Sequence, residues 1–306
     1  MALKKKGLGS LRISRILGIK NEDVVEGWIN RGTTPLCLLS KSYANYQNIL
    51  NNIKSAKDYP EDLAHIVGLL NGDGHLQIRK DHSSGISFYS KYLSEVQELD
   101  KQFERVFGMK GKIYEDKRKD KGYMLFFHSY ELAIFLQSLG IIEGRKTEQE
   151  YGIPDWILKA DKGVKSAFLR GIFSAEGFVS KKKSKDNEAR YRAGITQYKN
   201  INIKESCKMY LGQIKTLLEE FGVKCSNVHL SNRQKRKNFP DVQGYKFTFE
   251  EKSFENFYRY IKFDNKHKNK RMLEVLKDKH TAGFEPAHGC SAGNCLTSWP
   301  RVLKNE

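Results

Sequence analysis

Two stretches of this chain repeat one pattern. Residues 65–76 read His-Ile-Val-Gly-Leu-Leu-Asn-Gly-Asp-Gly-His-Leu, and residues 168–179 read Phe-Leu-Arg-Gly-Ile-Phe-Ser-Ala-Glu-Gly-Phe-Val. Each is an apolar run of helical character that ends in an acidic residue, Asp73 or Glu176, followed by glycine. A glycine at that place is typical of a left-handed helix end. The pattern predicts two helices that each terminate at a carboxylate.

Small residues lie four apart within each run. They are Gly68 and Gly72 in the first copy, and Gly171 and Ala175 in the second. This spacing lets two helices approach until their backbones touch. If the two runs pack together, Asp73 and Glu176 lie side by side at the end of the helix pair. Paired carboxylates on a basic protein suit metal-assisted phosphodiester cleavage.

The two runs resemble the signature of the LAGLIDADG homing endonucleases, in the single-chain form with two repeats. Residues 66–74 and 169–177 fill the nine motif positions and keep the central small residue, the terminal acid and the closing glycine. The resemblance implies an α+β fold of two pseudo-symmetric αββαββα repeats that form a DNA-binding saddle. It also implies a monomeric, intron-homing type of enzyme that cuts a long double-stranded DNA site, with Mg²⁺ held by Asp73 and Glu176.

The order of elements after each motif repeats as well. In the first copy we expect strands at 76–79 and 85–89, a helix at 92–107, strands at 111–114 and 123–127, and a helix at 130–139. In the second we expect strands at 178–181 and 191–198, a helix at 203–221, strands at 228–231 and 245–249, and a helix at 254–261. The expected domains are 1–58, 59–160 and 161–280, followed by an irregular tail at 281–306.

Charge and composition narrow the partner and the class of protein. The chain has 54 Lys and Arg against 36 Asp and Glu, a net charge of +18 that suits a polyanion such as DNA. No apolar stretch reaches the ~20 residues that span a bilayer, and no signal peptide opens the chain. The five cysteines are scattered, which argues against a disulfide framework. We therefore expect a protein of the cytoplasm (nucleoid-associated) or of an organelle, neither secreted nor bound to a membrane.

Basic side chains gather at the expected hairpin turns. Flexible tips suit phosphate contacts, whereas reading a base edge needs side chains on a rigid ribbon. The predicted phosphate contacts are Arg118, Lys119, Lys181, Lys182, Lys183, Arg233 and Arg236. The predicted base readers are Gln77, Arg79, Arg190, Arg192 and Gln197. A charged turn that only meets solvent is the alternative interpretation.

The resemblance also implies a basic residue after the last helix or loop of each repeat, which organises water and offsets charge at the scissile phosphate. Lys146, within residues 140–147, and Lys268, within residues 263–270, take that place as candidate catalytic residues. The second run holds three lysines, so its register stays open, and a surface lysine is the alternative. His65 and His75 flank the first motif, and we expect them to be structural because Mg²⁺ prefers oxygen ligands.

The first 58 residues form a different unit. Helical periodicity at 11–17 and 22–30, around Gly18, resembles a helix-turn-helix. This segment either adds DNA contacts or packs on the repeats, and the polar residues 51–58 predict a linker.

Two other functions suit the same fold: an RNA-splicing maturase that binds intron RNA, and a DNA-binding regulator. Retention of both acids favours the endonuclease, because splicing and repression do not require them.

Overall fold

A computed structural model describes residues 9–16, 26, 41–79, 84–116, 122–183, 189–231 and 241–281. The chain divides into two compact units, Met1–Ser55 and Ala56–Glu306. The first unit contains α2 (Ser10–Ile16) and α5 (Lys41–Ser55). Helix α2 confirms the first predicted N-terminal helix, whereas the second, at 22–30, lies outside the described residues except for residue 26, as does most of the tail. The predicted domain boundaries stay predictions.

The linker predicted at residues 51–58 includes the boundary between the two units, and its local structure is helical. Helix α5 continues to Ser55, and the 3₁₀ turn η1 (Ala56–Asp58) comes directly after it. The stretch is polar but holds neither glycine nor proline, so nothing in it breaks a helix. Its polar side chains therefore form a helix surface rather than an irregular connection.

The second unit is built on two motif helices, α6 (Pro60–Asp73) and α10 (Lys162–Glu176). Proline suits the first turn of α6, where its missing N–H would have no helical partner. Helix α10 starts at Asp161, whose carboxylate accepts a hydrogen bond from the backbone N–H of Val164 at 3.0 Å. The two helices pack against each other along their length, as the repeated runs predicted.

Glycines bring the backbones of the motif helices together. A Cβ added to Gly68 would collide with the carbonyl oxygen of Phe168 and would lie 2.9 Å from the backbone nitrogen of Ile172. A Cβ on Gly171 would likewise collide with the carbonyl oxygen of His65. A Cβ on Gly72 would collide with the side-chain Cβ of Ala175. The packing role predicted for Gly68, Gly72, Gly171 and Ala175 is therefore seen in the structure.

The glycine after each acid does not form the left-handed helix end that we expected. Gly74 has φ −85° and Gly177 has φ −71°, so both are extended, and each helix passes directly into a strand. Space is the reason for glycine here. A Cβ on Gly74 would lie 2.6 Å from the Cα of Leu70, and one on Gly177 would collide with the carbonyl oxygen of Phe173.

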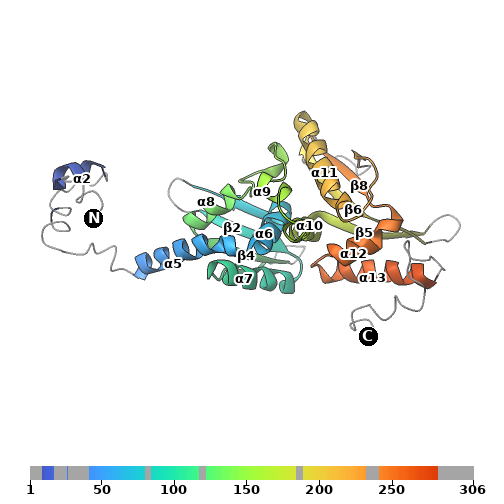
Figure 1. Ribbon diagram of the computed structural model, residues 1–306, viewed down its shortest axis with the longest axis horizontal. Coiled ribbons are helices and arrows are strands. Elements are labelled where there is room, and N and C mark those ends of the chain that lie inside the picture. Colours follow the sequence, from blue (N-terminus) through green and yellow to red (C-terminus); the bar gives the residue numbers. More distant parts are fainter. Residues whose placement is uncertain are drawn as a thin grey trace. The chain divides into compact units, whose positions relative to one another are not determined.

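Each motif helix begins a repeat, and the two repeats have the same order of α-helices and strands (Figure 1). In the first repeat the elements after α6 are β1 (Gly74–Gln77), β2 (Gly85–Ser90), α7 (Leu93–Phe107), β3 (Lys112–Asp116), β4 (Gly122–His128), α8 (Tyr130–Ser138), η2 (Lys146–Glu148) and α9 (Asp155–Leu158). In the second, after α10, they are β5 (Gly177–Lys183), β6 (Ala189–Asn200), η3 (Ile201–Ile203), α11 (Lys204–Glu219), β7 (His229–Leu230), β8 (Val242–Thr248), η4 (Glu251–Ser253), α12 (Phe254–Tyr260) and α13 (Lys266–Thr281).

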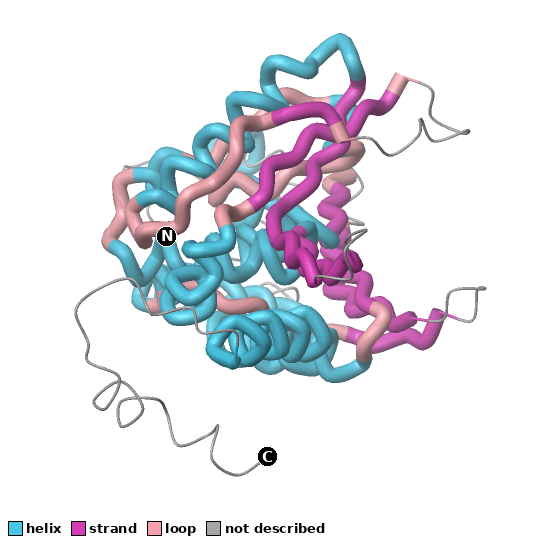
Figure 2. The backbone as a smooth tube through the Cα atoms, turned by 90° about the vertical axis from the view of Figure 1, so that its right-hand side faces the viewer, coloured by secondary structure: helices cyan, strands magenta, loops and turns pink. Residues whose placement is uncertain are grey.

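The strands form two four-stranded antiparallel sheets with the same connectivity. Their orders are β1-β2-β4-β3 and β5-β6-β8-β7, so the second repeats the first strand for strand. In the second unit the strands lie on one side and the helices pack on the other (Figure 2). The expected pseudo-symmetric α+β architecture is confirmed. No helix in the described ranges is long and apolar enough to cross a membrane.

Aromatic side chains fill the space between each sheet and its helices. In the first repeat, Phe103 of α7 stacks on Phe127 of β4 with 4.2 Å between ring centroids. In the second, Phe257 of α12 lies 4.7 Å from Phe249, measured between centroids. These rings cover the inner face of each sheet and leave its outer face to solvent.

The close helix contact gives a stability prediction that two glycine substitutions test. Gly171→Ala should lower the free energy of unfolding by about 1–3 kcal/mol, because the new methyl group meets backbone atoms of α6 that cannot move aside. The matched control is Gly212→Ala in α11, where a Cβ would meet nothing within 4 Å. The control should raise stability by about 0.5–1 kcal/mol, since alanine is the better helix former. Denaturant unfolding of both variants measures the contrast, and equal effects would show that the helices do not touch at Gly171.

Candidate active site

The ends of the two motif helices bring the acids of the two repeats into one site. Asp73 is the last residue of α6, and Glu176 is the last residue of α10. The neighbour of Asp73, Gly72, lies so close to Glu176 that an added Cβ would be 3.3 Å from the Cγ of that side chain. Both carboxylates act electrostatically on the same two lysines, Lys146 and Lys268. The structure thus places the four predicted catalytic residues together.

Each lysine binds the end of the motif helix in its own repeat. The Nζ of Lys146 donates to the carbonyl oxygens of Leu70 and Gly72, at 2.7 Å each. The Nζ of Lys268 donates to those of Ser174, at 2.6 Å, and Ala175, at 2.9 Å. The last carbonyls of a helix carry partial negative charge, so they suit an ammonium group, and the carbonyl oxygen of Leu70 also accepts from the backbone N–H of Gly74.

A second pair of contacts fixes the register of the lysines. The residue two before each acid binds the loop that carries the lysine: Asn71 Oδ1 accepts from the backbone N–H of Ile142 at 3.0 Å. Ser174 Oγ accepts from the backbone N–H of Asp264 at 2.7 Å. Lys146 follows Ile142 by four positions, as Lys268 follows Asp264. Lys268 is therefore the counterpart of Lys146, which resolves the choice among the three lysines of this run.

The surroundings shift the pKa values of these groups. Burial lowers the pKa of Lys146 to about 8, although the charges of Glu176 and Asp73 act to raise it. Burial also lowers the pKa of Lys268 against the same two acids and Glu95. Asp73 remains accessible to solvent, yet the atoms packed around its carboxylate raise its pKa against the influence of Lys268 and Lys146. The site therefore holds charges at reduced hydration.

The donor set fits a hard divalent cation. Asp73 and Glu176 supply carboxylate oxygens, which Mg²⁺ prefers. The described part of the chain contains no group of three or more His, Cys, Asp or Glu residues arranged to hold a metal ion. Two protein carboxylates leave several coordination positions for water and phosphate oxygens, the usual arrangement for Mg²⁺. The site suits a cation shared between protein and a phosphate-bearing ligand.

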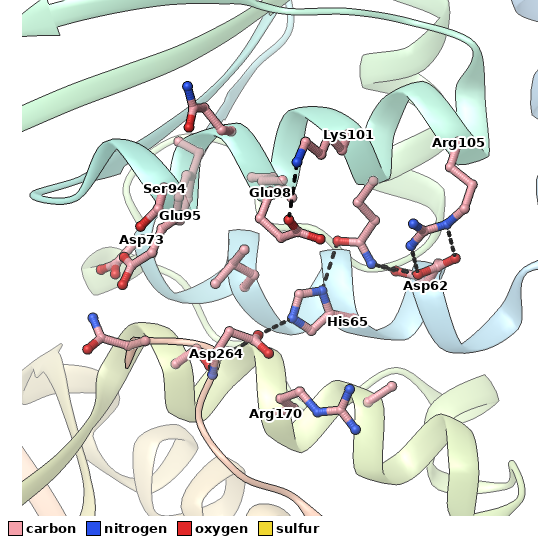
Figure 3. A pocket seen from close by; sticks show the side chains of 18 of the residues that line it. Asp62, His65, Asp73, Ser94, Glu95, Glu98, Lys101, Arg105, Arg170 and Asp264 are labelled. Atoms are coloured by element: carbon pink, nitrogen blue, oxygen red, sulfur yellow. Dashed lines mark hydrogen bonds and ion pairs between the residues drawn. The ribbon is translucent and has the colours of Figure 1, made fainter. Parts of the chain in front are cut away.

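A cavity of about 520 Å³ extends from the acid site along α6. Asp73 and Glu95 lie at one end, the Asp62–Arg105 ion pair at the other, and His65 between them (Figure 3). Sequence reasoning missed Glu95, a residue of α7. Burial raises the pKa of the Glu95 carboxyl, against the effect of its hydrogen bond from Ser90.

His65 connects the two repeats. Its Nε2 lies 2.5 Å from Oδ2 of Asp264, and its Nδ1 lies 2.9 Å from Oε1 of Gln102. Burial alone would lower the pKa of His65, but the hydrogen bond and charge of Asp264 outweigh it and raise the pKa. The histidine is bound by protein side chains, as expected of a structural residue. No sequence pattern joins two residues so far apart along the chain.

Of the five predicted base readers, the structure describes the side chains of all but Arg190. Gln77 and Arg79 are exposed at the end of β1, where Nη2 of Arg79 donates to Oε1 of Gln77 at 3.2 Å. Arg192 is exposed on β6. Gln197 is only 5% exposed, so its prediction as a base reader is wrong. Alternation along β6 turns Gln197 inward with Tyr191 and away from Arg192.

Most of the predicted phosphate contacts lie outside the described part of the chain. Lys181 is exposed, but it forms an ion pair with Asp278 of α13 at 3.0 Å, which offsets part of its charge. Arg118, Lys119, Arg233 and Arg236 lie outside the described residues, as do the side chains of Lys182, Lys183 and Arg190. Their roles stay predictions.

Sequence reasoning also missed Lys199. This residue of β6 is 1% exposed, and its Nζ donates to the carbonyl oxygen of Lys146 at 2.6 Å. The alternation of β6 was the available signal, because Lys199 shares its parity with the buried Tyr191, Ala193 and Ile195. A lysine in that register has to be buried.

Proteins with similar sequences differ widely in their names. A tRNA-splicing ligase RtcB of Pyrococcus abyssi is 30% identical over 182 residues, covering 56% of this chain and 19% of the ligase. The RNA polymerase subunit Rpo1N of Methanocaldococcus jannaschii is 30% identical over 201 residues, covering 58% of this chain and 15% of the subunit. The chain therefore spans less than a fifth of the length of these relatives.

One similar solved structure is the homing endonuclease I-DmoI in complex with DNA and Mn. It is 18% identical, covers 66% of this chain and 96% of that one, and has a TM-score of 0.44. The model of the LAGLIDADG-like domain matches residues 60–140 and 163–262, which are the two structural repeats. The match covers more than half of the chain and includes both motif helices, so this protein belongs to the LAGLIDADG family.

Proposed function

We propose that this chain is a site-specific, divalent-metal-dependent endonuclease that hydrolyses both strands of a long DNA target. The observation that carries the proposal is the site at the ends of α6 and α10. Two carboxylates and two lysines meet there, with one of each from each repeat. Membership of the LAGLIDADG family supports the same activity.

The residues have distinct parts in this reaction. Asp73 and Glu176 would hold the cation, which when bound lowers the pKa of water and stabilises charge on the phosphate. Lys146 and Lys268 supply positive charge beside the acids while their hydrogen bonds hold them to the helix ends. Because the two sets are related by the repeat, each serves one strand of the duplex.

The outer strand surfaces supply target recognition in this proposal. Gln77 on β1 and Arg192 on β6 have exposed side chains on strands, and Arg79 is exposed two residues after the end of β1, so all three suit base contacts. Both repeats belong to one chain, so the protein acts as a monomer. Mg²⁺ is the proposed metal.

The relatives support a self-contained module. A ligase and a polymerase subunit share this segment although their names give them different activities, and in each it occupies less than a fifth of the chain. A segment common to such proteins cannot be what makes one a ligase and the other a polymerase. We propose that the module cuts DNA to promote its own spread, with maturase or regulatory activity as the alternative outcomes of the cleavage test.

The acids give the first functional prediction. Asp73→Asn and Glu176→Gln should each abolish double-strand cleavage while specific binding persists, because each removes a cation ligand and changes no strand surface. Asp62→Asn is the matched control, an acid of the same helix that pairs with Arg105. Incubation with a DNA library and Mg²⁺, followed by mapping of cut ends, reads out cleavage. Full cutting by Asp73→Asn would contradict the assignment of Asp73 to the active site. A wild-type protein that binds DNA but never cuts it would favour the regulator, and one that binds intron RNA instead would favour the maturase.

Recognition gives a second prediction. Arg79→Ala and Arg192→Ala should each relax base preference in a different half of the target, by about 1–3 kcal/mol at the affected base pair. Arg259→Ala, an exposed arginine on α12, is the control and should leave the preference unchanged. Selection of binding sites from a randomised duplex measures all three. A loss of preference in the same half for both variants would contradict the assignment of one repeat to each half.

A further inference from the structure

Lys199 is a buried cation whose ammonium group contacts one short segment, residues 146–151. It lies on β6 of the second repeat and is 1% exposed. Its Nζ donates to the carbonyl oxygens of Lys146, at 2.6 Å, and Gln149. The same ammonium lies 3.5 Å from the ring centroid of Tyr151. These contacts join the sheet of the second repeat to the segment that leaves the first.

Burial of a charge is costly, so the presence of a lysine at this position needs an explanation. Removal from water lowers the pKa of Lys199 to about 8, and the nearby Lys146 charge acts in the same direction. A methionine or leucine would fill the same space among Tyr151, Cys207 and their neighbours without that cost. What an apolar residue cannot do is donate to the two carbonyl oxygens.

The two lysines of the active site have unequal supports. Lys268 lies in the first turn of α13, a helix of 16 residues whose start is capped by Asn265 Oδ1, which accepts from the backbone N–H of Lys268 at 2.8 Å. Lys146 lies in η2, a 3₁₀ turn of three residues, and the backbone from Gln149 to Pro154 is irregular. No helix continues from this turn, and Lys199 donates to the carbonyl oxygen of its first residue, Lys146, and to that of Gln149, which follows it.

We propose that Lys199 is a positioning residue, which holds η2 from the sheet of the second repeat and thereby keeps Lys146 on the carbonyl oxygens of Leu70 and Gly72. Lys199 touches neither acid in this arrangement and acts through the backbone of Lys146. It makes the placement of the first repeat's lysine depend on the second repeat. The catalytic meaning of this contact rests on the proposed endonuclease function, whereas the contact itself does not.

The first test needs no nuclease activity. Lys199→Met keeps the volume and removes the donors, and amine acetylation read by mass spectrometry reports how well each lysine is protected. Lys146 should be acetylated about tenfold faster in the variant, the effect of losing roughly one net hydrogen bond. Lys268 in the same molecule is the internal control and should not change. Unchanged protection of Lys146 in folded Lys199→Met would overturn the proposal.

Two further variants separate positioning from stability. Lys165→Met removes another largely buried lysine of the second repeat, which pairs with Glu220 at 2.8 Å, and should lower stability without exposing Lys146. Exposure of Lys146 in that variant too would mean that any loss of stability releases it, which contradicts a specific role for Lys199.

Tyr151→Leu keeps both hydrogen bonds from Lys199 and removes only the aromatic ring beside its ammonium group, so this variant is used if Lys199→Met does not fold. It should expose Lys146 in the same direction but less, and no exposure would count against the proposal.

The second test concerns cleavage and uses a double-mutant cycle. If Lys199 acts through Lys146, then Lys199→Met should slow nicking of the strand that Lys146→Met slows, and should add nothing in a Lys146→Met background. Additive losses would show an independent role and overturn the proposal. If the wild type cuts no DNA, the endonuclease proposal fails, and acetylation of Lys146 still decides the role of Lys199.

Discussion

Contact between the backbones of α6 and α10 is the constraint on which the rest of the second unit depends. Glycine at residues 68 and 171 lets each helix meet carbonyl oxygens of the other, at distances that no side chain permits. Both helices then run directly into strands, because Gly74 and Gly177 leave room for that turn. The acids at the two helix ends consequently lie close together, and the first strand of each sheet begins directly after its acid.

The lysine-bearing loops depend on the same helix ends. The polar residue two positions before each acid, Asn71 or Ser174, binds a backbone N–H of its loop. The lysine four positions after that N–H then donates to the last carbonyls of the helix. The two repeats use this arrangement alike. They differ in the element that carries the lysine, which is a capped helix in the second repeat and a single turn in the first. Contacts from the opposite repeat, by Lys199 and by His65, tie the two lysine loops into the unit.

Periodicity and repetition made most of the fold predictable, because alternation and helical spacing within each repeat report local geometry directly. They also placed the acids, since a repeated motif with a terminal carboxylate is visible along the chain. The prediction for Gln197 ignored the alternation of side chains along β6, in which odd-numbered residues face inward and Arg192 faces outward. The His65–Asp264 contact was beyond prediction, because it is made by tertiary packing between residues with no shared pattern. The left-handed conformation expected of the glycines after the acids was wrong. Glycine is selected both by a left-handed turn and by a lack of space for a Cβ, and the sequence alone does not distinguish these two reasons.

The central claim is that the paired helix ends make one cation site from the acids of both repeats. Anomalous diffraction from Mn²⁺, in crystals of the protein with a selected DNA duplex, tests it most directly. We predict manganese bound by carboxylate oxygens of Asp73 and Glu176 and by phosphate oxygens of the DNA. Manganese bound elsewhere, or carboxylates of Asp73 and Glu176 that face separate regions of the duplex, would contradict it.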